Sequence, residues 1–139
     1  MKKRNYIISY PAHATQEQQN LMIDACYWFL NRYNMQYHGN TFDAMTDGIE
    51  DVCIVTNSKT YKEMECWGQC YEWDDEGSDT DYVIDIDFDQ KIRDLIATIF
   101  HECVHLLQWE RGTWKGEGER EAEDLQYELA DEYWKCGNV

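Results

Sequence analysis

The sequence is poor in basic residues, has one proline and lacks any long apolar run. Only 12 lysines and arginines stand against 28 aspartates and glutamates, which gives a net charge of −16. This charge repels nucleic acids and anionic membrane surfaces, so we expect neither as a direct ligand. No stretch approaches the roughly eighteen apolar residues of a membrane-spanning helix, and no secretory apolar core follows the basic start. We therefore expect a protein that stays in the cytoplasm of the producing or host cell.

The six cysteines lack the paired spacing of disulfide-rich domains and of four-cysteine zinc sites. Cys66 and Cys70 form one close pair, and no second close pair completes such a site. We therefore expect reduced thiols in the interior. The chain has 139 residues, of which 43% are hydrophobic and 14% aromatic. These values predict one folded domain over residues 1–139 in spite of the high charge.

Hydrophobic spacing along the chain changes between strand-like and helix-like periods. The expected elements are a strand at 5–10, a helix at 16–33 capped by Thr15, strands at 52–56, within 61–73 and at 82–88, and helices at 90–110 and 119–135. Together they predict an α+β domain, in which a small, mostly antiparallel sheet is combined with an N-terminal helix, a motif-bearing helix and a C-terminal helix.

The predicted strand at residues 82–88 has acidic residues at alternate positions. Asp85, Asp87 and Asp89 fall on one face, and large apolar residues fall on the other. This pattern predicts a half-buried edge strand with three carboxylates toward solvent. Two interpretations remain open, because these carboxylates could select basic substrates or could only protect an exposed edge from aggregation.

The segment His-Glu-Cys-Val-His at residues 101–105 places two histidines four positions apart inside a predicted helix. Residues at this spacing project from the same side of a helix, so both imidazoles can bind one metal ion. Glu102 lies beside them, where its carboxylate can hold and deprotonate a metal-bound water. The pattern predicts a zinc site with His101 and His105 as ligands and Glu102 as the general base.

A catalytic zinc site normally has three protein ligands, and no histidine follows His105. The third ligand is therefore expected to be a carboxylate. The acidic run at residues 117–124 opens the next predicted helix and supplies four glutamates and one aspartate. Glu119 and Glu121 both border the apolar stripe of that helix, so a helical wheel does not separate them.

With this motif and this acidic run, the chain resembles the gluzincins, the zincin peptidases with a glutamate as third zinc ligand, and especially the short HExxH proteins of phages and bacteria. In these families the ligand is a glutamate followed by alanine on the next helix, often written E-x-E-A. The matching residues here are Glu119, Arg120, Glu121 and Ala122. The resemblance covers roughly residues 82–134 and implies a minimal zincin fold, a bound Zn²⁺ and Glu121 as the third ligand.

Other residues are candidates for supporting roles. Asp124 could accept a hydrogen bond from a ligand imidazole, or it could be an ordinary surface residue. An oxyanion could be stabilised by Tyr82, Tyr127, His38 or Arg120, among which the sequence does not choose.

The motif and the resemblance lead us to expect a zinc metallopeptidase acting on a peptide or protein substrate, with a basic substrate as one option. Two alternatives remain open. An acidic zincin-like module could act only by binding, as a decoy or inhibitor of a host protein or as a mimic of nucleic acid. The same zinc site could also hydrolyse a non-peptide amide.

Overall fold

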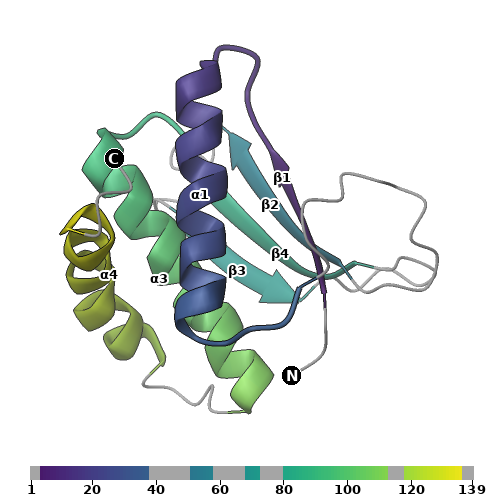
Figure 1. The fold of residues 1–139 in the computed structure, drawn as a ribbon. Helices are drawn as coiled ribbons and strands as arrows, with labels where there is room; N and C mark the ends of the chain where they lie inside the picture. Colours follow the sequence, from purple (N-terminus) through teal and green to yellow (C-terminus); the bar gives the residue numbers. More distant parts are fainter. Residues whose placement is uncertain (1–3, 38–50, 58–67, 73–79, 113–117, 136–139) are drawn as a thin grey trace.

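The computed structural model describes residues 4–37, 51–57, 68–72, 80–112 and 118–135. In chain order its elements are β1 (Asn5–Ser9), α1 (Gln16–Arg32), β2 (Asp51–Asn57), β3 (Gly68–Glu72), β4 (Thr80–Asp87), α3 (Ile92–Arg111) and α4 (Gly118–Lys135). Helices α1 and α3 lie on one face of a four-stranded sheet, and α4 packs against α3 (Figure 1). Helix α3 is therefore central, in contact with both other helices and with the sheet.

The strand order of the sheet is β1-β2-β4-β3. Among the described strands, β1 with β2 and β2 with β4 are parallel, and β3 with β4 is antiparallel. The mixture of helices and strands agrees with the expected α+β class, but the expectation of a mostly antiparallel sheet is wrong. Parallel neighbours need a crossover connection, and α1 provides one between β1 and β2, which hydrophobic periodicity alone does not indicate.

Strand β4 lies inside the sheet, between β2 and β3, so its predicted edge position is wrong. Alternation along a strand indicates which face is buried, but not which strands lie beside it. The predicted exposure of its acidic residues is also wrong in part. Asp87 is only 4% exposed, and its Oδ1 accepts a hydrogen bond from the Asp89 backbone N–H at 2.9 Å. Asp85 is half-buried, and Asp89 is exposed beyond the end of the strand.

Helix α1 begins and ends within one residue of the predicted bounds. Thr15 Oγ1 accepts a hydrogen bond from the Gln18 backbone N–H at 3.1 Å, and Gln18 Oε1 accepts one from the Thr15 backbone N–H at 2.9 Å. This reciprocal capping box satisfies two N–H groups that a helix start leaves without partners. The buried side of α1 includes Met22, Ala25 and Phe29, as the spacing predicts.

Helix α3 has a broad apolar side, which includes the buried residues Leu95, Ile99 and Leu106. It ends at Gly112, which has a φ of 67° and donates its backbone N–H to the Trp109 carbonyl oxygen at 3.1 Å. Glycine adopts this left-handed conformation without the steric penalty of a side chain, so the helix stops at this position.

The cysteine expectation is confirmed where the structure describes it. Cys26, Cys70 and Cys103 are free thiols, and Cys26 and Cys103 are buried. The expectation for Cys66 and Cys136 falls outside the described residues. Within the described ranges, no helix combines the length and the apolar character needed to cross a membrane.

Candidate metal centre

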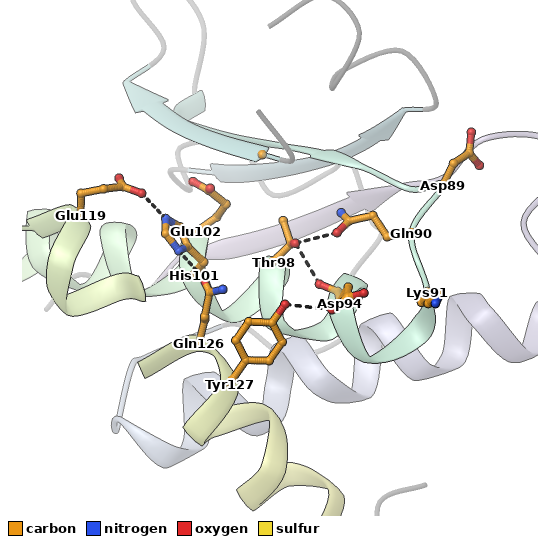
Figure 2. A pocket seen from close by; sticks show the side chains of 11 residues that line it. Asp89, Gln90, Lys91, Asp94, Thr98, His101, Glu102, Glu119, Gln126 and Tyr127 are labelled. Atoms are coloured by element: carbon orange, nitrogen blue, oxygen red, sulfur yellow. Dashed lines mark hydrogen bonds and ion pairs between the residues drawn. The ribbon is translucent and has the colours of Figure 1, made fainter. Parts of the chain in front are cut away.

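Two imidazoles on α3 face one carboxylate on α4. The rings of His101 and His105 have centroids 4.9 Å apart. His101 Nε2 lies 2.7 Å from Glu119 Oε1, and His105 Nε2 lies 2.9 Å from Glu119 Oε2. The ligand atoms that these three residues offer all lie within 4.8 Å of one another, so one metal ion could be held among them. Figure 2 shows Glu119 reaching His101 from the first turn of α4, with Glu102 beside them.

The structure brings Glu119, and not Glu121, to the two imidazoles. Glu121 is exposed, and its Oε1 accepts a hydrogen bond from Gln108 Nε2 at 2.9 Å. Side chains two positions apart on a helix point in widely different directions, so only one of the two glutamates can face the histidines. We therefore correct the third candidate ligand from Glu121 to Glu119. The helical wheel left the two equivalent, because the choice depends on how α4 docks on α3.

The donor atoms suit a catalytic zinc ion. Two imidazole nitrogens and one carboxylate oxygen are the ligands of many such sites, which keep a fourth position open. Burial lowers the pKa of His105, so its imidazole is held in the neutral form that a metal binds. The Glu119 side chain is 59% exposed, which leaves one side of the centre accessible from solvent.

Two glutamines hold the imidazoles in orientation. Gln126 Oε1 lies 2.5 Å from His101 Nδ1, and Gln108 Oε1 lies 3.1 Å from His105 Nδ1. An amide oxygen only accepts hydrogen bonds, so both Nδ1 atoms carry the proton. In a neutral imidazole that carries its proton on Nδ1, Nε2 is the nitrogen that a metal binds.

Gln108 also connects α3 to the start of α4. Its side chain is buried, and its Nε2 donates a hydrogen bond to the Gly118 carbonyl oxygen at 2.9 Å. A Cβ at position 118 would lie 2.6 Å from Gln108 Oε1, so glycine permits the close approach of the two helices. Asp124, the sequence candidate for supporting a ligand imidazole, lies instead on the exposed surface of α4. The i, i+3 spacing of His105 and Gln108 could have indicated this glutamine.

We expect Gln108→Leu to weaken zinc binding by about 10- to 100-fold, the usual effect of losing a residue that orients a ligand imidazole. Leucine has a similar size but cannot accept the Nδ1 proton of His105. Zinc affinity would be measured by competition with a chelator of known affinity, and circular dichroism would check the fold. Gln16→Leu, on the exposed start of α1, is the matched control. Unchanged affinity in Gln108→Leu would contradict the orienting role.

Glu102 is buried close to this centre with an unsatisfied oxygen. The residue is only 3% exposed, and within the described part of the chain its Oε2 has no hydrogen-bond partner. Burial, together with the charge of Glu119, raises the pKa of Glu102 to about 8. A buried polar atom without a partner costs about 1–3 kcal/mol, which indicates that a ligand in the centre supplies the missing hydrogen bond.

A cavity of about 600 Å³ lies over the centre, and its lining includes His101, Glu102 and Glu119. Gly68 at the start of β3 also lines it. A Cβ at this position would lie 3.2 Å from Glu102 Oε1 and 3.0 Å from Thr98 Cγ2. Glycine therefore lets the strand pass close to the carboxylate. Glu102, His101 and Glu119 therefore share one accessible space, and His105 is buried beside it.

Known proteins do not add to this description. No protein family, curated protein or solved structure matches this chain. Inferences about function therefore depend on the motif and on the geometry of the centre.

The structure separates the four candidates for stabilising an oxyanion. Tyr82 and Arg120 do not line the cavity, and His38 falls outside the described residues. Tyr127 lines the cavity, but its hydroxyl donates a hydrogen bond to Asp94 Oδ1 at 2.8 Å. This hydrogen bond, with a smaller effect from burial, raises the pKa of Tyr127, so the phenol stays protonated. Tyr127 is therefore the one described candidate that lines the cavity, but its hydroxyl is engaged by Asp94 and not by the candidate ligands.

Proposed function

We propose that this protein is a zinc-dependent peptidase that hydrolyses peptide bonds with Glu102 as the general base. The observation that carries the proposal is the buried Glu102 carboxylate, which has an unsatisfied oxygen and lines the same cavity as His101 and Glu119, two members of the cluster that could hold a metal ion. Structural zinc sites have four protein ligands, whereas this cluster offers three among the described residues. A three-ligand cluster beside an accessible cavity favours a catalytic centre.

In the proposed reaction the residues of the chain have separate tasks. His101, His105 and Glu119 would hold a zinc ion, which when bound polarises the scissile carbonyl and lowers the pKa of a water. Glu102 takes a proton from this water and passes it to the leaving amine. Burial raises the pKa of Glu102 to about 8, near neutrality, which suits a group that both takes up and releases a proton.

The order of elements supports a zincin-like arrangement as part of the proposal. The motif helix α3 follows β4, and the next helix supplies the third candidate ligand, as the resemblance to gluzincins implies. The resemblance points to the second glutamate of the E-x-E-A segment. The geometry favours the first, Glu119, and we propose that this chain uses it.

Metal analysis and a cleavage assay test the proposed function together. Purified protein is supplied with one equivalent of zinc and incubated with unfolded casein, with magnesium in place of zinc as the control. We expect one zinc per chain and cleavage fragments that disappear when a chelator removes the metal. Zinc binding without cleavage of casein or of a mixed peptide library would favour an acidic binding module. A chain that binds no zinc would contradict the proposal as a whole.

A further inference from the structure

The cavity over the metal centre continues along α3 toward the N-terminal end of that helix. Asp94, Thr98 and His101 lie about one turn apart and line the cavity in a row. Figure 2 shows this row, with Tyr127 of α4 reaching Asp94. The seven positions between Asp94 and His101 correspond to about 10 Å along the helix axis. The cavity therefore has a second end, away from the candidate ligands.

The carboxylate of Asp94 is held at this second end. The guanidinium of the neighbouring Arg93 lies over the ring of Tyr127, 5.0 Å from the ring centroid, and its charge acts on Asp94 from there. Its Oδ1 accepts a hydrogen bond from the Tyr127 hydroxyl at 2.8 Å, and Thr98 Oγ1 lies 2.9 Å from its backbone carbonyl oxygen. Within the part of the chain that the structure describes, Asp94 forms no ion pair. The adjacent Arg93 pairs with Asp131 instead, at 2.8 Å. A half-buried carboxylate that forms no ion pair with a described residue can bind the cationic group of a ligand.

Negative charge predominates at this end of the cavity. Among the residues that the structure describes, Asp89 and Asp94 line it together with a single basic residue, Lys91. His13 lies 3.1 Å from Asp89, which is exposed, and its ring packs edge-on against Phe88. Lys91 is exposed at the start of α3, so solvent screens its charge more than that of the half-buried Asp94. The net charge of −16 adds a field that attracts cationic ligands.

We propose that Asp94 binds the basic side chain of a residue next to the scissile bond and thereby selects peptides with lysine or arginine at that position. This inference rests on the proposed function and names its substrate class. Lysine and arginine have long stems, which can span the distance between the metal centre and Asp94, whereas short side chains cannot. The stem would lie against the ring of Tyr127, which is 38% exposed. Glu102 independently marks the cavity as a ligand site, because its unsatisfied buried oxygen belongs to the same lining.

Two peptides that differ at one residue test this inference. One peptide has lysine next to the cleaved bond, and the other has norleucine, which lacks the charge, at the same position. The comparison is made once with this position before the cleaved bond and once with it after the bond. Cleavage is measured with the zinc-loaded wild type, and binding is measured with zinc-loaded Glu102→Gln. Asp94→Asn is then introduced into both, since asparagine keeps the acceptor for Tyr127 and removes the charge. Glu128→Gln, exposed on α4 and outside the cavity lining, is the control with the same change of net charge.

We expect the lysine peptide to be bound and cleaved about tenfold better than the norleucine peptide, as measured by Kd and kcat/KM. The preference should disappear in Asp94→Asn and persist in Glu128→Gln. Zinc content and circular dichroism verify that Asp94→Asn is folded, and Asp94→Ser is a second neutral variant if it is not.

The two proposals fail in different ways. Selective binding of the lysine peptide that depends on Asp94, without cleavage of any peptide, supports the inference and contradicts only the proposed hydrolysis. Cleavage without a preference for lysine, or with a preference that survives Asp94→Asn, overturns the inference and leaves the proposed function intact. Absence of both binding and cleavage overturns both.

Discussion

Replacement of Glu102 by glutamine is expected to lower peptide hydrolysis by about a thousandfold, within the range that a positioned general base contributes. Glutamine has the shape of the original side chain but cannot take a proton from water. The position is 3% exposed and next to a candidate ligand, so a substitution of equal size is needed to preserve the packing of α3. The loss should appear in kcat, measured on a casein-derived peptide at saturating zinc.

The zinc content of Glu102→Gln decides how the loss of activity is interpreted. We expect one zinc per chain, as in the wild type, because the three candidate ligands are unchanged. Glu123→Gln, an exposed residue of α4, is the matched control and should keep full activity. Activity retained by Glu102→Gln would remove the general base from the mechanism. Activity and zinc lost together would give Glu102 a role in holding the metal instead.

The second large effect concerns the third ligand. We expect Glu119→Ala to weaken zinc binding by more than about a hundredfold, beyond the loss usual for residues that only orient a ligand. Glu119 is the residue whose two carboxylate oxygens lie within 2.9 Å of the two imidazole Nε2 atoms. Affinity would be measured by chelator competition, with the fold of each variant checked by circular dichroism.

Glu121→Ala is the matched control for this experiment, because it removes the same side chain from the same turn of α4. Its carboxylate contacts Gln108 at 2.9 Å rather than the histidines, so the affinity for zinc should change by less than about tenfold. The reverse order of effects would restore Glu121 as the ligand, as the resemblance to gluzincins implies. Equal effects would mean that α4 has a different orientation when the metal is bound.

The helices could be predicted from the sequence because their apolar residues recur with a clear period. For α1, the capping residue Thr15 also marked the start, and the predicted helix begins at the first observed residue, Gln16. The pairing of the strands could not be predicted in this way. Periodicity reports the buried face of each strand, whereas the parallel pairs β1–β2 and β2–β4 depend on contacts between distant segments.

The candidate metal centre was predictable to the extent that its residues are close together in the sequence. His101, Glu102 and His105 lie on adjacent turns of one helix, and a spacing rule brings them together. Glu119 and Gln126 belong to another helix, so their positions depend on the docking of α4 on α3. The acidic run at residues 117–124 could be named from the sequence, but a helical wheel did not separate Glu119 from Glu121, and the resemblance to gluzincins pointed to Glu121. Two interpretations of the β4 aspartates were open, selection of basic substrates and protection of an exposed edge, and both assumed exposed carboxylates, whereas Asp87 is buried.

The candidate ligands belong to two separate helices, so a bound ion would affect the lifetime of the protein. His101 and His105 belong to α3, and Glu119 belongs to the first turn of α4. An ion that binds across this junction recognises the folded chain only, so by mass action it stabilises that state by about 2.7 kcal/mol at a hundred times its Kd. Withdrawal of the ion would loosen the start of α4 first and open it to proteolysis. Metal supply would thus govern the abundance of the protein as well as its chemistry.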